Sequence, residues 1–125
     1  MLTWPSTVRV FVSTLPTDMR RSFDGLAALA ADVVGGDPLS GHLFVFFNRR
    51  SDRVKILFWD RSGYCLWYKR LEEGTFRLPE HASNATGIEI DMSQLSLILE
   101  GIDLSGARRR KRFVAGLGNS ARHIA

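Results

Sequence analysis

Basic side chains form two blocks in this 125-residue chain, and their chemistry is the easiest to assign. Residues 48–70 hold seven basic and two acidic side chains, or +5, and residues 108–125 hold six basic and no acidic ones, or +6. Guanidinium and ammonium groups bind phosphate oxygens through charge-assisted hydrogen bonds, so both blocks predict contact with a polyanion. The candidate nucleic-acid-binding residues are Arg49, Arg50, Arg53, Lys55, Arg61, Lys69, Arg70, Arg108, Arg109, Arg110, Lys111 and Arg112.

Each block also has a structural alternative. The arginines between 48 and 53 can equally form a solvated turn, and the last 18 residues can serve solubility alone. Four aromatic residues flank the second expected turn and could stack on unpaired bases. Packing in the core is the favoured role for aromatic residues in strands, so we expect at most one or two of the four to be exposed. They are Trp59, Tyr64, Trp67 and Tyr68.

No pattern of catalytic or metal-binding residues stands out. Asp18, Asp24 and Asp60 would be the carboxylates of a metal-dependent nuclease, but a helix cap, an arginine partner and a turn explain them more simply. The three histidines are isolated, and the single cysteine, Cys65, excludes a disulfide within the chain. We therefore expect no catalytic residues, no metal and no cofactor.

Composition predicts one globular domain. Hydrophobic residues make up 45% of the chain and charged residues 24%, both close to globular averages. We expect a single α+β domain over 1–107 and a flexible basic tail over 108–125. No signal peptide or membrane-spanning stretch is visible, so we expect a cytoplasmic protein. Residues 71–107 carry one basic and seven acidic side chains, or −6, which also fits an adaptor that binds another protein.

Hydrophobic periodicity predicts the elements that position these charges. Alternation from Val8 to Ser13 indicates a first strand. Residues 17–34 then show the spacing of one long helix, capped by Thr17 or Asp18 and ended at Gly35. Its apolar stripe is Met19, Phe23, Leu26, Ala30 and Val33.

The middle of the chain favours strands. Leu43–Phe47, Val54–Trp59 and Tyr64–Arg70 are rich in aromatic and β-branched residues and are separated by short polar turns, which predicts an antiparallel meander. Short further strands are expected at Thr75–Leu78 and Ile88–Ile90.

A second helix should cover 91–102. Asp91 and Gln94 have the spacing of a capping box at its start. The complete prediction is an α+β fold, with a mainly antiparallel β-meander sheet of four to six strands packed against one long N-terminal helix. The shorter C-terminal helix is placed at the edge of the sheet.

Several ordered segments over roughly residues 5 to 104 form a recognisable pattern: Val8–Val10, Thr17–Arg20, Phe23–Leu26, Asp37–Phe46, Asn48–Arg50, Asp52–Leu57, Trp59–Asp60, Lys69–Glu72, Gln94–Leu95 and Leu99–Asp103. In this order they resemble the TnpB accessory proteins of the insertion-sequence-sixty-six family of bacterial transposons.

The resemblance implies a non-catalytic accessory factor for DNA transposition, encoded beside a helix-turn-helix protein and a transposase. It supplies no active-site residues. Combined with the basic blocks, it predicts binding to DNA at the transposon ends or in the strand-transfer complex. The alternative is a protein–protein adaptor for the transposase or the helix-turn-helix protein without direct DNA contact.

Overall fold

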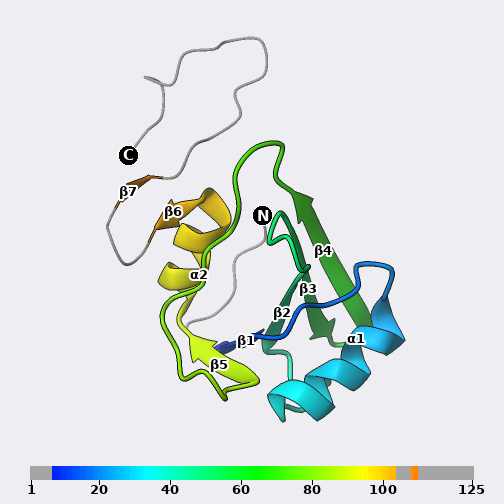
Figure 1. Ribbon diagram of the computed structural model, residues 1–125. Helices are drawn as coiled ribbons and strands as arrows, with labels where there is room; N and C mark the ends of the chain where they lie inside the picture. The colour runs from blue at the N-terminus through cyan, green and yellow to red at the C-terminus, as the bar shows by residue number, and fades with distance from the viewer. Residues whose placement is uncertain (1–6, 104–107, 110–125) are drawn as a thin grey trace.

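The computed structural model describes residues 7–103 and 108–109, and a five-stranded sheet lies at its centre (Figure 1). The strand order is β4-β3-β2-β1-β5. The strands are β1 (Val10–Ser13), β2 (Leu43–Phe47), β3 (Arg53–Asp60), β4 (Gly63–Arg70) and β5 (Gly87–Ile90). The helices are α1 (Phe23–Leu29), the π-helix η1 (Ala30–Val34) that continues it, and α2 (Met92–Glu100). A separate pair is formed by β6 (Ile102–Asp103) and β7 (Arg108–Arg109).

The predicted meander of β2, β3 and β4 is confirmed, but the sheet is mixed. β2–β3, β3–β4 and β1–β5 pair antiparallel, whereas β1 and β2 pair parallel. The connection between β1 and β2 contains α1 and η1, and a helical crossover of this kind returns the chain in the same direction. The antiparallel prediction rested on the short turns between β2, β3 and β4, and such turns are absent from the longer connection between β1 and β2.

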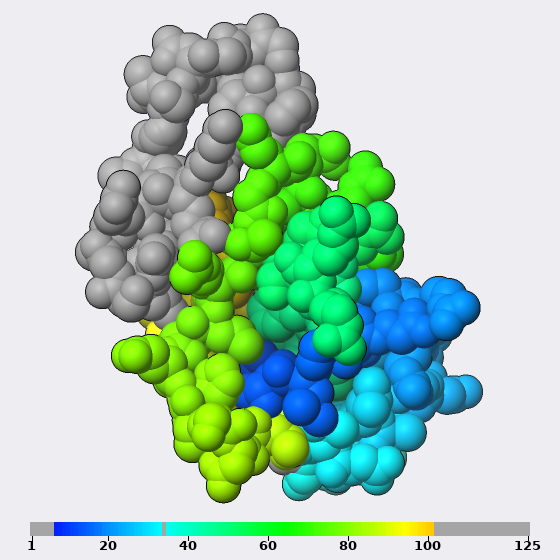
Figure 2. Space-filling model, in the orientation of Figure 1, coloured from blue at the N-terminus to red at the C-terminus, as the bar shows by residue number. Residues whose placement is uncertain are grey.

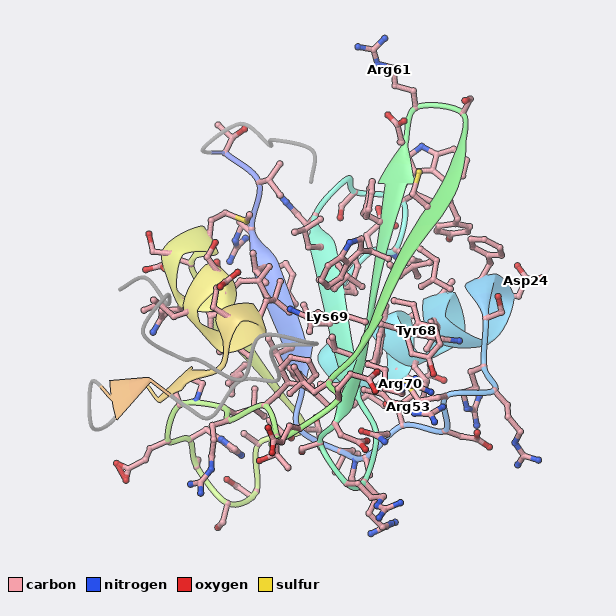
Figure 3. The ribbon with its side chains drawn as sticks, turned by 90° about the horizontal axis from the view of Figure 1, so that it is seen from above. Asp24, Arg53, Arg61, Tyr68, Lys69 and Arg70 are labelled. Atoms are coloured by element: carbon pink, nitrogen blue, oxygen red, sulfur yellow. The ribbon has the colours of Figure 1, made fainter. Side chains whose placement is uncertain are left out.

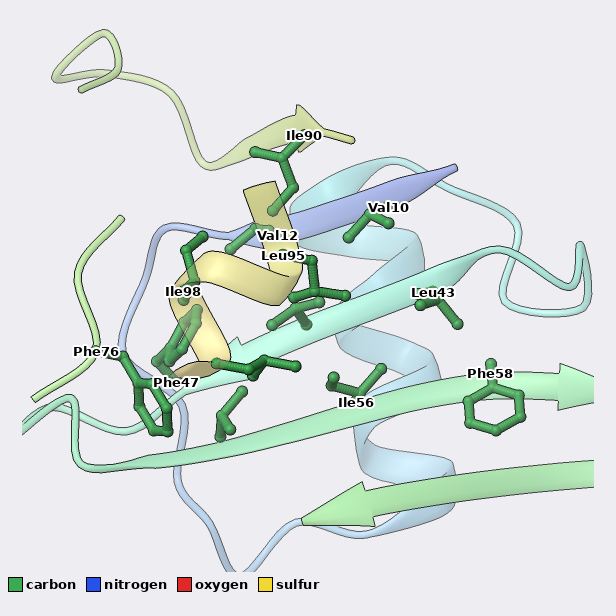
Figure 4. Packing of buried hydrophobic residues seen from close by; sticks show 13 residues of the cluster. Val10, Val12, Leu43, Phe47, Ile56, Phe58, Phe76, Ile90, Leu95 and Ile98 are labelled. Carbon is green, nitrogen blue, oxygen red and sulfur yellow. The ribbon is translucent and has the colours of Figure 1, made fainter. Parts of the chain in front are cut away.

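The two helices cover opposite faces of the sheet. Val10, Val45 and Ile56 pack with α2 on one face, whereas Phe44 and Leu57 pack with α1 on the other. Figure 4 shows α2 in front of the strands and α1 behind them. The placement of the second helix at the sheet edge was therefore wrong. All five residues of β2 are buried, as expected for a central strand covered on both sides.

The first helix begins later than predicted, at Phe23 instead of Thr17. The carbonyl oxygens of Met19 and Arg21 accept hydrogen bonds from the Lys55 ammonium group at 2.7 and 2.8 Å. In a helix that started at Thr17, these carbonyls would bind backbone N–H groups four residues later. The single long helix is thus two shorter pieces, α1 and η1, and they end at Gly35 with a φ of 77°, as predicted.

The start of α2 follows its sequence signal. The Asp91 side chain accepts the Gln94 N–H at 2.7 Å, and the Gln94 side chain accepts the Asp91 N–H at 3.0 Å. Gly101 ends the helix in a left-handed conformation. The predicted strand over 75–78 does not form; Phe76 is buried in the core from a loop instead.

Within the described residues, no helix is long and apolar enough to span a membrane. Two residues of the predicted tail form β7, and its remaining residues, 110–125, lie outside the described part of the chain.

Candidate nucleic-acid interface

Three chain segments meet at the end of the sheet where β2 ends and β3 begins. The Thr17 N–H donates to the Phe47 carbonyl at 2.8 Å, which fixes the segment before α1. The Leu71 N–H donates to the Asp52 carbonyl at 2.8 Å, and the Phe76 N–H to the Ser51 carbonyl at 2.7 Å. Figure 2 shows the segment before α1 in blue beside the green surface around residue 50. Backbone hydrogen bonds therefore hold all three segments together.

The turn between β2 and β3 presents two arginines to solvent. The Asn48 side-chain oxygen accepts N–H groups of Asp52 and Arg53 at 3.1 and 3.0 Å, and its amide donates to the Asp52 carboxylate at 2.7 Å. Asp52 is thus held by Asn48. Arg49 and Arg50 are exposed, and neither makes a hydrogen bond or ion pair with another described residue. Both guanidinium groups are available to an external anion.

Arg53 and Arg70 are direct partners in the β3–β4 register and lie on the α1 face of the sheet. The Arg53 guanidinium donates to the Tyr68 hydroxyl oxygen at 3.2 Å. Arg70 is exposed and forms an ion pair with Glu72 at 3.1 Å. Two positive groups therefore lie at neighbouring positions beside the turn.

Arg20 and Arg21 reach the same end of the sheet from the segment before α1, and they were not among the predicted site residues. Arg20 pairs with Asp18 at 2.7 Å, and this hydrogen bonding lowers the pKa of Asp18 to about 2. Arg21 is exposed and its side chain lies against Gly25. The adjacent arginine pair was visible in the sequence, but its place beside the turn depends on the contact between Thr17 and Phe47.

We call this surface the arginine end. Its cations are Arg20, Arg21, Arg49, Arg50, Arg53 and Arg70.

Lys55 was predicted to contact phosphate, but it has a structural role. The residue is only 7% exposed, its ammonium group donates to the two carbonyls before α1, and it lies 4.8 Å from the centroid of the Tyr68 ring. Burying an ammonium group is tolerated when such acceptors replace water. Lys55 therefore holds the segment that carries Arg20 and Arg21 against the sheet.

Two further predicted cations lie away from the arginine end (Figure 3). Lys69 is on the α2 face, and its ammonium group donates to the Leu99 carbonyl at 2.9 Å, near the C-terminus of α2. Arg61 lies at the far tip of the β3–β4 hairpin, with a φ of 52°. The structure thus separates both residues from Arg49, Arg50, Arg53 and Arg70.

The second basic block lies largely beyond what the structure describes. Arg108 and Arg109 contribute backbone to β7. Arg110, Lys111 and Arg112 lie outside the described residues.

Among the four aromatic candidates, one is exposed, as expected. Tyr68 is 47% exposed, whereas Trp59, Tyr64 and Trp67 are half-buried. The Trp59 and Tyr64 rings contact each other edge to face, with centroids 5.2 Å apart. Of these four residues, Tyr68 is therefore the exposed one, and it lies beside Arg53.

The carboxylates and histidines are not grouped as a metal site would require. Within the described ranges, no three His, Cys, Asp or Glu side chains lie together in a way that could hold a metal ion. His42 accepts the Arg9 N–H at 2.9 Å, and Arg9 pairs with Glu89 at 2.6 Å. The hydrogen bond from Arg9 lowers the pKa of Glu89.

The described residues form a small α+β protein with arginines gathered at one end of its sheet, and comparisons with known proteins place it more closely. A family model described as IS66 Orf2 like protein matches residues 8–109. The uncharacterized protein y4jC of Sinorhizobium fredii is 36% identical over 103 residues, covering 82% of this chain and 86% of that protein. The uncharacterized protein y4hO of the same organism is 42% identical over 103 residues, covering 82% and 88%. No solved structure matches the chain.

The chain belongs to the IS66 Orf2 like family. This result confirms the resemblance found in the sequence. Membership links the chain to the transposition of insertion sequences and to the transposition machinery of these elements. The family is an accessory family and not a known enzyme family.

Proposed function

We propose that the chain is a non-catalytic accessory factor of transposition that binds DNA through the arginine end. The observation that carries the proposal is the pair Arg49 and Arg50, both exposed and both without a partner among the described residues. Guanidinium groups fit phosphate oxygens in bidentate geometry. Asn48 fixes the backbone of the turn that carries these groups, so the turn need not be ordered when DNA binds.

Such an interface binds the DNA backbone without reading its sequence. Phosphate contacts position a protein on DNA and release condensed counterions, so affinity falls steeply as salt concentration rises. Sequence selection would then come from the transposase and the helix-turn-helix protein of the same element, which we propose as partners in a shared DNA complex. The cations at 108–112 would add to the affinity for the DNA backbone.

The adaptor alternative has less support, because several acidic residues of 71–107 are used within the chain. Glu72 pairs with Arg70, Glu89 pairs with Arg9, and Asp91 caps α2. These carboxylates are less available to a basic partner protein than their number in the sequence implied.

The test compares two exposed sites on the same protein. Arg49→Ala with Arg50→Ala should weaken binding to duplex DNA and reduce the slope of log affinity against log salt by about 1.8, since each phosphate contact contributes about 0.9. Arg61→Ala is the matched control, because Arg61 is an exposed turn arginine at the other end of the β3–β4 hairpin. The double variant should also impair transposition, whereas the control should not.

Two results would contradict this proposal. An effect of Arg61→Ala that is as large per charge removed as that of the double variant would show that DNA binding follows net charge and not the arginine end. Unchanged transposition in the double variant, with folded protein, would remove its functional role.

A further inference from the structure

Tyr68 is held in an unusual setting for an exposed aromatic residue. It lies on β4, the edge strand of the sheet, and its side chain is on the α1 face. The Lys55 ammonium group lies over the ring at 4.8 Å, and the hydroxyl oxygen accepts a hydrogen bond from Arg53 at 3.2 Å. Tyr68 is nevertheless 47% exposed to solvent. Two cations therefore hold a side chain that is still accessible from outside.

The Tyr68 ring is a flat apolar group, and its neighbours Lys55, Arg53 and Arg70 are positively charged. Lys55 occupies one side of the ring, and β4 has no strand beyond it among the described residues. Arg70 follows two positions later on the same face, directly opposite Arg53 in the register. Figure 3 shows Tyr68, Arg53 and Arg70 gathered at this end of the hairpin, with Arg61 far from them. An aromatic face beside guanidinium groups is the combination that binds single-stranded nucleic acid.

We propose that Tyr68 is a stacking platform for an unpaired DNA base, with Arg53 binding the phosphate beside it and Arg70 exchanging its exposed partner Glu72 for a phosphate. The inference rests on the proposed DNA binding and adds the form of DNA preferred: a single strand or an overhang. Bases inside a duplex stack on their own neighbours, so their faces are closed to Tyr68. An unpaired base has an open face, and stacking is tolerant of base identity.

The other aromatic candidates do not offer such a platform. Trp59 and Tyr64 contact each other and are half-buried, and Trp67 packs against the core on the α2 face. Stacking at the arginine end is therefore assigned to Tyr68 alone among these four residues.

The experiment measures binding of the full chain to a blunt duplex and to the same duplex with a short single-stranded overhang. The unaltered protein should bind the overhang duplex more tightly. Tyr68→Leu should weaken binding to the overhang duplex by roughly five- to one-hundred-and-fifty-fold, the range expected for losing one stacked base, and leave binding to the blunt duplex unchanged. Tyr68→Phe is the matched control, because it keeps the ring and removes only the hydroxyl acceptor, and it should retain the preference.

The outcomes separate this inference from the proposed function. Binding to both duplexes without preference, or equal weakening of both by Tyr68→Leu, would overturn the platform while leaving DNA binding in place. No binding to either duplex would overturn both. Should Tyr68→Leu fail to fold, photocrosslinking of the unaltered protein to iododeoxyuridine in the overhang decides the matter. A crosslink at Tyr68 supports the inference, and crosslinks only at other residues reject it.

Discussion

The lysines and the arginines of residues 48–70 lie close together in the sequence but occupy different environments in the structure. Lys55 and Lys69 lie within β3 and β4, and each donates to the backbone of a segment that covers the sheet, Lys55 to two carbonyls and Lys69 to one. Arg49 and Arg50 extend from the turn into solvent. A compact ammonium group with three donors suits carbonyl oxygens, whereas the planar guanidinium suits phosphate.

The comparison shows that positive charge along a chain is a poor measure of positive surface. Of the seven basic residues at 48–70, two stabilise packing and a third, Arg61, lies at the opposite end of the hairpin. Two residues outside the block, Arg20 and Arg21, join the surface instead. Structural lysines and binding arginines should therefore respond differently to substitution.

The largest effect is expected from removing residues 108–125. The truncated chain keeps eleven basic and thirteen acidic residues, a net charge of −2, so the arginine end becomes its main basic surface. Loss of five phosphate contacts would reduce the salt slope by roughly 4.5 and cut affinity by two to three orders of magnitude at moderate salt. Titrations of both proteins with duplex DNA at several salt concentrations measure this change. Equal slopes would show that the tail does not bind DNA.

Lys55→Met should lower the free energy of unfolding by about 3 kcal/mol. The substitution keeps most of the apolar part of the side chain but leaves the part-buried carbonyls of Met19 and Arg21 without their donor, and acceptors that lose their donor away from water are costly. Chemical denaturation measures the change. Under conditions where the variant is folded, a change in DNA salt slope comparable to that of Arg49→Ala with Arg50→Ala would mean that Lys55 binds phosphate after all.

Lys69→Met should destabilise the protein less, by about 1 kcal/mol, because the side chain is half-buried and donates to one carbonyl. The same denaturation experiment applies. A loss as large as that of Lys55→Met would show that the contact with the end of α2 matters as much as the contact before α1.

The smallest effect on stability is expected for Arg49→Ala with Arg50→Ala, within about 0.5 kcal/mol, since exposed side chains without partners contribute little to folding. Thermal melts of this variant should overlay those of the unaltered protein. A large drop in melting temperature would place the two arginines in a structural network and end the comparison on which the proposal rests.

Local sequence signals predicted much of the fold. Short polar turns predicted the meander of β2, β3 and β4, Gly35 predicted the end of the first helical segment, and Asp91 with Gln94 predicted the start of α2. These features depend on residues within a few positions of each other, which is why periodicity and turn chemistry were sufficient.

The features that the sequence did not predict depend on distant contacts. The Lys55 ammonium group binds carbonyls 36 and 34 positions away, and this contact both buries the lysine and delays the first helix. Lys69 reaches a carbonyl 30 positions away. The sequence predicted a cluster of arginines at the turn, but the place of Arg20 in the arginine end depends on the hydrogen bond between Thr17 and Phe47. No local pattern encodes such pairings.

The most direct test is an NMR titration of isotope-labelled protein with duplex DNA, in which the backbone amide chemical shifts are recorded at each step. We predict that the largest shifts among the described residues fall at 17–22, 48–53 and 70–72, while the shifts at 60–64 and in α2 stay nearly unchanged. Shifts centred on 60–64, or on the acidic stretch from 72 to 91, would contradict the claim that the arginine end is the DNA-binding surface.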